Sequence, residues 1–316
     1  MRIALALAAA LAVALPAQAA REDASLTKLQ ARDRQLFATG WRLATANAPF
    51  CEGAAPKLGL SVLDAGGFGD SAAVRAKLGL AGDLAAGAIA PESPAAKAGL
   101  QVNDTLIALN GTNLVAQFPR AKPAWQRLID VTAAFDAAAA TGPVTVTYRH
   151  GESSPQTVTV SGIPACPTRF EVLDSGSAAK AEGTRVIFGV SFPGFDYPEA
   201  EFAAAVAHEF AHNLLGHRKL LDARGRSLGN VRLTEREADR LMPWLLANAG
   251  YDPNAALTFM QRWGPRHDGG LFRNRNHEGW DERAEAIAAE IEGMTPHLAS
   301  EGRADWAKHF VREVLD

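Results

Sequence analysis

The chain of 316 residues lacks the signatures of several protein classes. It has only two cysteines, Cys51 and Cys166, and neither belongs to a CxxC pair of the redox or zinc-binding kind. No basic cluster stands out and the net charge is -3, which argues against nucleic acid as a partner. After the first residues, no stretch approaches the roughly 20 consecutive apolar residues that a transmembrane helix needs. The sequence therefore predicts neither a nucleic acid partner nor a later membrane span.

The first 19 residues have the three parts of a secretory signal peptide. Arg2 supplies the positive start, residues 3–15 are apolar, and Ala17-Gln18-Ala19 is a small-residue cleavage site. No cysteine follows closely enough to receive a lipid anchor. We therefore expect a protein exported to a bacterial periplasm or released outside the cell, with no membrane span after cleavage.

Export to an oxidising compartment gives the two cysteines a structural use. A disulfide between Cys51 and Cys166 would join the two ends of the region between them and restrict the unfolded chain. The alternative interpretation is a pair of buried thiols.

The motif His208-Glu209-Phe210-Ala211-His212 reads HExxH. On a helix, residues four apart share a face, so both imidazoles can reach one metal ion. A catalytic zinc accepts such nitrogens and keeps one position open for water, from which Glu209 can take a proton. An apolar stripe is predicted on roughly the opposite side of the helix, at Phe202, Val206, Phe210 and Leu214. The alternatives are a chance match or two histidines on an ordinary helix surface.

A third metal ligand is expected in residues 234–239. Glu235 and Asp239 share a helix face, whereas Glu237 points away by about 200° and fits a capping box with Thr234. We therefore predict Glu235 as the ligand and Asp239 as a residue that orients a ligand. The alternative is a solvated acidic helix start. Residues 218–231, rich in glycine and basic residues, are expected to form a loop, either over the cleft or without a special role.

Together these motifs resemble the zinc peptidases of the HtpX and CAAX-prenyl-protease type. The similarity covers about residues 168–295 and rests on HExxH, on the ExxAD motif from Glu235 to Asp239, and on Ala249-Gly250-Tyr251-Asp252-Pro253. The resemblance implies one zinc ion and a mainly α-helical, zincin-like domain with a small β-sheet. It also implies that His217 lies close behind the metal ligands.

The family has a His-Pro pair that precedes an arginine by six residues. Here His277 and Arg283 keep that spacing, with Glu278 in place of the proline. The resemblance implies that His277 approaches the metal or the developing oxyanion. The family also uses an edge strand to align the substrate backbone, and residues 185–192 are predicted to be such a strand or an ordinary core strand.

Residues 56–162 resemble a PDZ domain of the bacterial-protease type. The resemblance rests on residues 93–100, on residues 103–107 and on the turn pair Asn110-Gly111. It implies a groove beside a helix at residues 122–138 that binds peptides or C-terminal segments as an added strand. The loop for the terminal carboxylate would be Leu58, Gly59, Leu60 and Ser61. The alternative is a PDZ-shaped spacer that binds nothing tightly.

The predicted organisation is a multidomain protein. A signal peptide (1–19) precedes an N-terminal helical segment (20–50) packed on the last domain, a mixed α/β PDZ domain (51–166) and a zinc metallopeptidase domain (167–316). The expected function is zinc-dependent cleavage of misfolded or unassembled exported polypeptides, with Glu209 as general base. The alternative is a non-catalytic envelope binding or chaperone-like protein that carries a vestigial metal site.

Overall fold

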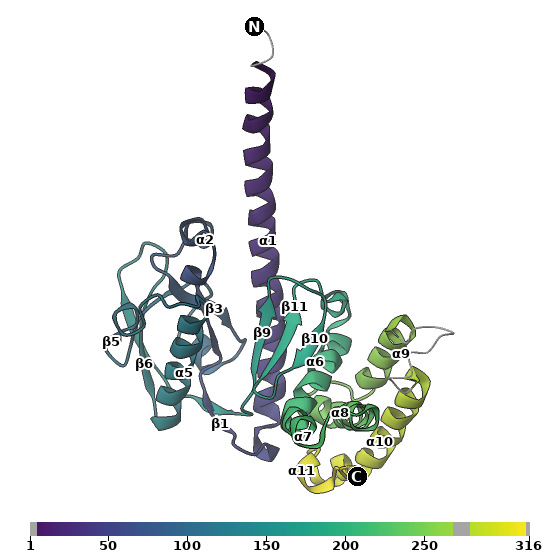
Figure 1. Ribbon diagram of the computed structural model, residues 1–316. Coiled ribbons are helices and arrows are strands. Elements are labelled where there is room, and N and C mark those ends of the chain that lie inside the picture. Colours follow the sequence, from purple (N-terminus) through teal and green to yellow (C-terminus); the bar gives the residue numbers. More distant parts are fainter. Residues whose placement is uncertain (1–4, 268–278, 314–316) are drawn as a thin grey trace.

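The computed structural model describes residues 5–267 and 279–313. A sheet-rich region and a mainly helical region lie on either side of the long helix α1 (Leu5–Ala46) (Figure 1). Because α1 is continuous, the expected signal peptide and N-terminal helical segment belong to one helix, and the cleavage site stays a prediction. In the described part of the chain, none of the helices combines the length and apolarity that crossing a membrane requires.

Helix α1 packs on the mainly helical region, as its apolar spacing predicts. Leu36 and Leu43 are fully buried and belong to the core of that region. Gly40 faces the ring of Phe170 so closely that a β-carbon at this position would lie 2.2 Å from the ring. Leu26, further toward the N-terminus, packs instead on a small cluster of the sheet-rich region. Helix α1 therefore packs against both regions.

The sheet-rich region contains a six-stranded sheet with the order β2-β3-β4-β6-β7, in which β5 pairs with β4. Its strands are β2 (Leu60–Asp64), β3 (Leu84–Ile89), β4 (Thr105–Leu109), β5 (Thr112–Asn113), β6 (Val144–Arg149) and β7 (Gln156–Val160). The helices are α2 (Ser71–Leu78), α3 (Pro94–Lys97), α4 (Leu114–Gln117) and α5 (Gln126–Thr141), with a 3-10 turn at Ala65–Gly67. Strand β2 is an edge of this sheet.

The two ends of this region are joined at its base. Strand β1 (Ala55–Lys57) pairs antiparallel with β8 (Ile163–Ala165), and a 3-10 turn spans Ala48–Phe50. Beside this pair, Cys51 and Cys166 form the predicted disulfide. The alternative of two free thiols is wrong. A covalent link across 115 positions limits the conformations of the unfolded chain and so favours the folded region.

The helical region begins with a three-stranded sheet in the order β10-β11-β9. Strand β9 (Arg169–Leu173) is parallel to β11 (Arg185–Gly189), and β10 (Ala179–Ala181) is antiparallel to it. The interpretation of residues 185–192 as an edge strand is therefore wrong. Strand β11 is central, with most of its residues buried, because apolar side chains face both sides of it. The edges are β9 and β10.

After a 3-10 turn (Pro193–Asp196), the region consists of α6 (Glu199–Leu214), α7 (His217–Arg224), α8 (Leu228–Asn248), α9 (Ala255–His267), α10 (Trp280–Glu301) and α11 (Trp306–His309). The expected loop at residues 218–231 is wrong, because α7 and the first turn of α8 occupy most of it. The expected capping box is wrong as well. Ser227 caps α8 by accepting from the backbone N–H of Asn230, and Thr234 lies inside the helix with its hydroxyl donating to Val231.

Candidate metal centre

Helix α6 turns one face into the core and the other toward α8. Phe202, Val206 and Phe210 are fully buried, as the predicted stripe requires. The side chains of His208 and His212 are 13% exposed on the other side of the helix. Helical periodicity produces this division, since residues four apart align and residues two apart diverge. The two imidazoles thus face the neighbouring helix instead of the core.

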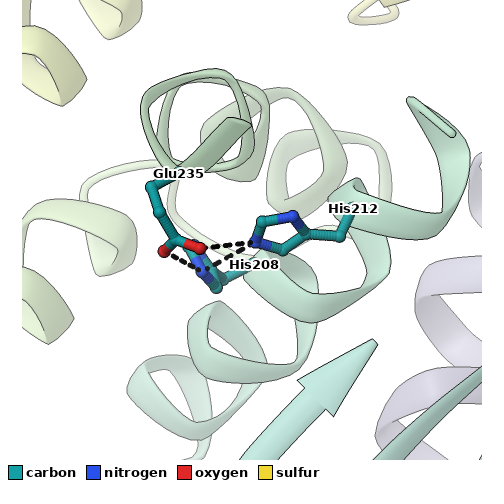
Figure 2. A group of neighbouring side chains, drawn as sticks. All are labelled: His208, His212 and Glu235. Carbon is teal, nitrogen blue, oxygen red and sulfur yellow. Dashed lines mark hydrogen bonds and ion pairs between the residues drawn. The ribbon is translucent and has the colours of Figure 1, made fainter. Parts of the chain in front are cut away.

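The structure brings His208, His212 and Glu235 together (Figure 2). The Nε2 atoms of the two histidines are 3.2 Å apart. Glu235, carried by α8, places its Oε2 3.4 Å from Nε2 of His208 and its Oε1 3.5 Å from Nε2 of His212. In a tetrahedron with zinc bonds of about 2.0–2.2 Å, ligand atoms are about 3.3–3.6 Å apart. Two imidazole nitrogens and a carboxylate thus converge at distances close to these values, and they are the types of ligand that zinc accepts.

Asp239 backs His208, as predicted for a residue that orients a ligand. Its Oδ1 lies 3.0 Å from Nδ1 of His208, the nitrogen that faces away from Glu235. The Asp239 side chain is fully buried and accepts two hydrogen bonds from Arg283, at 2.5 and 2.9 Å. The arginine balances the buried carboxylate, which lies on the Nδ1 side of His208 and leaves Nε2 toward the centre.

His217 lies behind His212, where the resemblance implied it. Its Nδ1 is 2.8 Å from Nδ1 of His212, and only 1% of the residue is exposed. Its other nitrogen faces Glu237, which is also fully buried. Glu237 does point away from the donor atoms, but its expected capping function is wrong, because α8 begins well before it.

Glu209 lies beside the edge strand β10. Burial raises its pKa to about 7; the charge of His208 lowers it, the charge of Glu235 raises it, and a hydrogen bond from the backbone of Ala181 lowers it. A carboxylate with a pKa near neutrality can both accept and return a proton. The contact with Ala181 could not be found from sequence, since no motif links these positions.

The electrostatics of the cluster suit a cation. Burial disfavours a charged ring at His208, but contacts with Asp239 and Glu235 outweigh it and raise the pKa of His208 to about 10. Burial and the neighbouring charge of His208 lower the pKa of His212 to about 3. The pKa of Glu235 falls well below its usual range, because contacts with the two histidines outweigh its burial. The two carboxylates thus favour positive charge between them.

Two other expected residues have different outcomes. His277 lies outside the described residues. Arg283, six positions later, reaches the centre from α10, with its Nη2 3.7 Å from Glu235 in addition to its contact with Asp239. Sequence spacing alone could not reveal this double contact.

A second group of possible ligands, His297, Glu301 and His309, lies near the C-terminal end of α10. The two imidazole rings are stacked, with centroids 3.8 Å apart and planes inclined by 20°. Because the lone pairs lie in the planes of the rings, nearly parallel rings direct them side by side instead of toward one point. The arrangement therefore lacks the convergence found at His208, His212 and Glu235.

The predicted carboxylate loop borders a groove between β2 and α5. Leu58, Gly59, Leu60 and Ser61 line a cavity of about 120 Å³. Gly59 has φ +74°, and its carbonyl accepts the backbone N–H of Ala90. Other walls come from outside the sheet-rich region, namely Phe37 and Trp41 of α1 and Phe170 of β9. Helix α1 and strand β9 thus contribute walls to the cavity between β2 and α5.

The comparisons with known proteins identify one part of the chain. No curated protein matches it. A family model described as a PDZ domain matches residues 86–134, which run from β3 to the middle of α5. The sheet-rich region therefore contains a PDZ domain.

Proposed function

We propose that this protein is a zinc-dependent endopeptidase with the overall organisation of a zincin-like domain and a PDZ domain. The observation that carries the proposal is the convergence of His208, His212 and Glu235, whose imidazole nitrogens lie 3.2 Å apart and 3.4 and 3.5 Å from the two oxygens of the carboxylate. A zinc ion held there would act as a Lewis acid and lower the pKa of a water molecule. The fourth position is left to water and substrate.

Glu209 is the general base of the proposed reaction. Its carboxylate follows His208 directly in α6, and its pKa of about 7 suits transfer of a proton from the attacking water to the leaving amine. His277 stays a proposed contributor at the oxyanion.

Strand β10 is the proposed guide for the substrate backbone. It is an edge strand, its only partner among the described strands is β11, and its Ala181 contacts Glu209. An extended polypeptide can pair with such an edge through backbone hydrogen bonds, independently of its side chains. This arrangement suits an enzyme that cuts unfolded polypeptides of varied sequence. We therefore assign to β10 the alignment of the substrate backbone that was expected of residues 185–192.

The PDZ domain is proposed to recruit chain ends of misfolded or unassembled exported proteins. Strand β2 is an edge strand flanked by α5, which is the arrangement used for binding a peptide as an added strand. The expected export of the protein, to a periplasm or outside the cell, agrees with the disulfide between Cys51 and Cys166.

The test compares the purified protein with Glu209→Gln and with Glu285→Gln, which makes the same charge change at an exposed site on α10. Zinc content is measured in all three, together with cleavage of casein and of a mixture of denatured proteins by mass spectrometry. We expect one zinc per chain in each protein and cleavage by all except Glu209→Gln.

Two outcomes would contradict the proposal. Equal cleavage by the wild type and Glu209→Gln would exclude Glu209 as the base. Absence of zinc and of cleavage, with binding of C-terminal peptides that survives chelator treatment, would favour the non-catalytic binding or chaperone-like alternative.

A further inference from the structure

Both proposed ligand histidines are backed by a buried carboxylate that is paired with an arginine. We call the series of contacts from a ligand histidine to its carboxylate and arginine a line. For His208 the line is short, because Asp239 contacts it directly and Arg283 balances Asp239. For His212 the line is longer and includes a second imidazole. Its carboxylate, Glu237, lies only two positions before Asp239 in α8.

The second line begins at the nitrogen of His212 that faces away from the centre. The Nδ1 atoms of His212 and His217 are 2.8 Å apart, and the rings meet edge to face at 78°. The Nε2 atom of His217 is 3.1 Å from Oε2 of Glu237. His217 is 1% exposed and Glu237 is fully buried, so water does not compete for these contacts.

The partners assign one proton arrangement to the whole line. The Nε2 atom of His212 faces His208 and Glu235, so as a metal ligand it must be free of a proton. The proton of His212 then sits on Nδ1 and is donated to Nδ1 of His217. His217 must therefore carry its own proton on Nε2, which donates to Glu237. Because an ionised carboxylate only accepts, Glu237 admits this order alone, whereas an amide at position 237 could also donate to His217 and would leave the order open.

Glu237 is held in place by the C-terminal segment of residues 310–313. Arg312 donates two hydrogen bonds to its carboxylate, at 2.8 and 2.9 Å. The backbone N–H of Glu313 donates a third, at 2.7 Å. A buried carboxylate without these partners would be costly, because burial penalises an unpaired charge.

The same segment is attached to α8 by contacts outside the line. Arg236 forms an ion pair with Glu313. Arg240 donates to the backbone carbonyl of Val311 at 3.3 Å and lies over the ring of Phe310. These contacts attach the segment outside the line. Loss of one of them leaves the three hydrogen bonds to Glu237 in place, so it tests attachment of the segment apart from the line.

We infer that Glu237 and Arg312 are positioning residues for the metal centre, so that the C-terminal segment completes the site. Glu237 sets the tautomer and orientation of His217, which sets those of His212, and Arg312 holds the Glu237 carboxylate in place through two hydrogen bonds. The inference rests on the proposed zinc site. It adds that residues about a hundred positions after HExxH, with no motif of their own, contribute to zinc affinity.

The test measures zinc affinity of the full chain by competition with a chromogenic chelator, which needs no proteolytic activity. Arg312→Gln is the main variant, because its side chain is 43% exposed and the fold should tolerate the change. Glu237→Gln keeps the shape of the buried group, and Arg312→Lys keeps the charge but loses the paired hydrogen bonds. Arg236→Gln is the control.

We expect zinc affinity to fall about 10- to 100-fold in Arg312→Gln and Glu237→Gln, the usual cost of losing a residue behind a metal ligand. The zinc affinity of Arg312→Lys should lie between those of Arg312→Gln and the wild type, and the zinc affinity of Arg236→Gln should match that of the wild type. The visible spectrum of the cobalt-substituted protein should change in Arg312→Gln and Glu237→Gln. Thermal unfolding in chelator separates this effect from a general loss of stability.

The inference is overturned if Arg312→Gln and Glu237→Gln bind zinc as tightly as the wild type does. It is also overturned if Arg236→Gln loses as much affinity as Arg312→Gln, because attachment of the segment would then be sufficient. If the wild type binds no zinc, the proposed function fails instead, so the two failures can be told apart.

Discussion

Asp33 of α1 accepts a hydrogen bond from the backbone N–H of Val172 in the edge strand β9, at 3.1 Å. Burial raises the pKa of Asp33 to about 7, and although the hydrogen bond from Val172 lowers it, the nearby charge of Glu171 adds to the increase. A raised pKa in the folded protein means that folding favours the protonated carboxyl. The folded protein should therefore be more stable when Asp33 is neutral, because burying the charge costs more than the hydrogen bond from Val172 returns.

This relationship predicts a pH dependence of stability. The contribution of Asp33 to the stability of the folded protein is fully present below its ordinary pKa of 3.8 and is lost as the pH rises to about 7. Each pKa unit corresponds to about 1.4 kcal/mol, so the loss is a few kcal/mol at most. In urea unfolding, the unfolding free energy of Asp33→Asn should increase relative to that of the wild type as the pH rises through this range. With the exposed Asp174→Asn as control, a difference that is constant with pH in both variants would contradict the prediction.

Gly40 should not tolerate a side chain. A β-carbon there would lie 2.2 Å from the Phe170 ring, so Gly40→Ala must displace α1 from β9. We expect a loss of about 1–3 kcal/mol of unfolding free energy, the usual cost of overpacking a core. Gly293→Ala in α10 is the matched control, since no atom lies within 4 Å of its β-carbon. That change should stabilise the protein by up to about 1 kcal/mol through helix propensity. Equal effects of the two substitutions in urea unfolding would refute the packing argument.

Removal of metal should lower the stability of the helical region. Zinc at 100 times its dissociation constant adds about 2.7 kcal/mol to a folded protein that binds it. We expect the melting temperature to fall on dialysis against chelator and to recover with zinc in the wild type and in the exposed-site control Glu292→Gln. Glu235→Gln should recover little, because it replaces a carboxylate ligand by an amide. The melting temperatures are measured by differential scanning calorimetry. Full recovery of the melting temperature in Glu235→Gln would exclude Glu235 as a ligand.

Trp41 should restrict access to the PDZ groove. Its Cζ2 atom lies 3.2 Å from the position of a β-carbon on Gly59, and the cavity of about 120 Å³ is small for a peptide. Trp41→Ala is expected to raise the affinity for a peptide with an apolar C-terminus several-fold, as measured by fluorescence anisotropy. Trp125→Ala, at a residue 58% exposed and outside the cavity lining, should leave the affinity unchanged. Weaker binding by Trp41→Ala would mean that the indole supports the peptide.

Local spacing determined a good part of this protein. The periodicity of α6 predicts which of its residues face the core, and the structure has His208 and His212 on the opposite side. The phase of α8 likewise separates Glu235 and Asp239 from Glu237. The turn and helix signals of the PDZ domain were also readable, since they depend on residues close in sequence. Such features follow from backbone geometry, which repeats every 3.6 residues in a helix.

Only the tertiary structure decided the features that join distant positions. Residues 185–192 could be an edge strand or a core strand by sequence, and pairing with β9 and β10 makes β11 central. Local spacing predicted a capping function for Glu237, but packing of α7 and the C-terminal segment makes it the buried partner of His217 and Arg312. Residues of α1 form one wall of the groove beside β2. These outcomes depend on which surfaces meet when the chain collapses, and no local pattern encodes a contact across 75 or more positions such as that of Glu237 with Arg312.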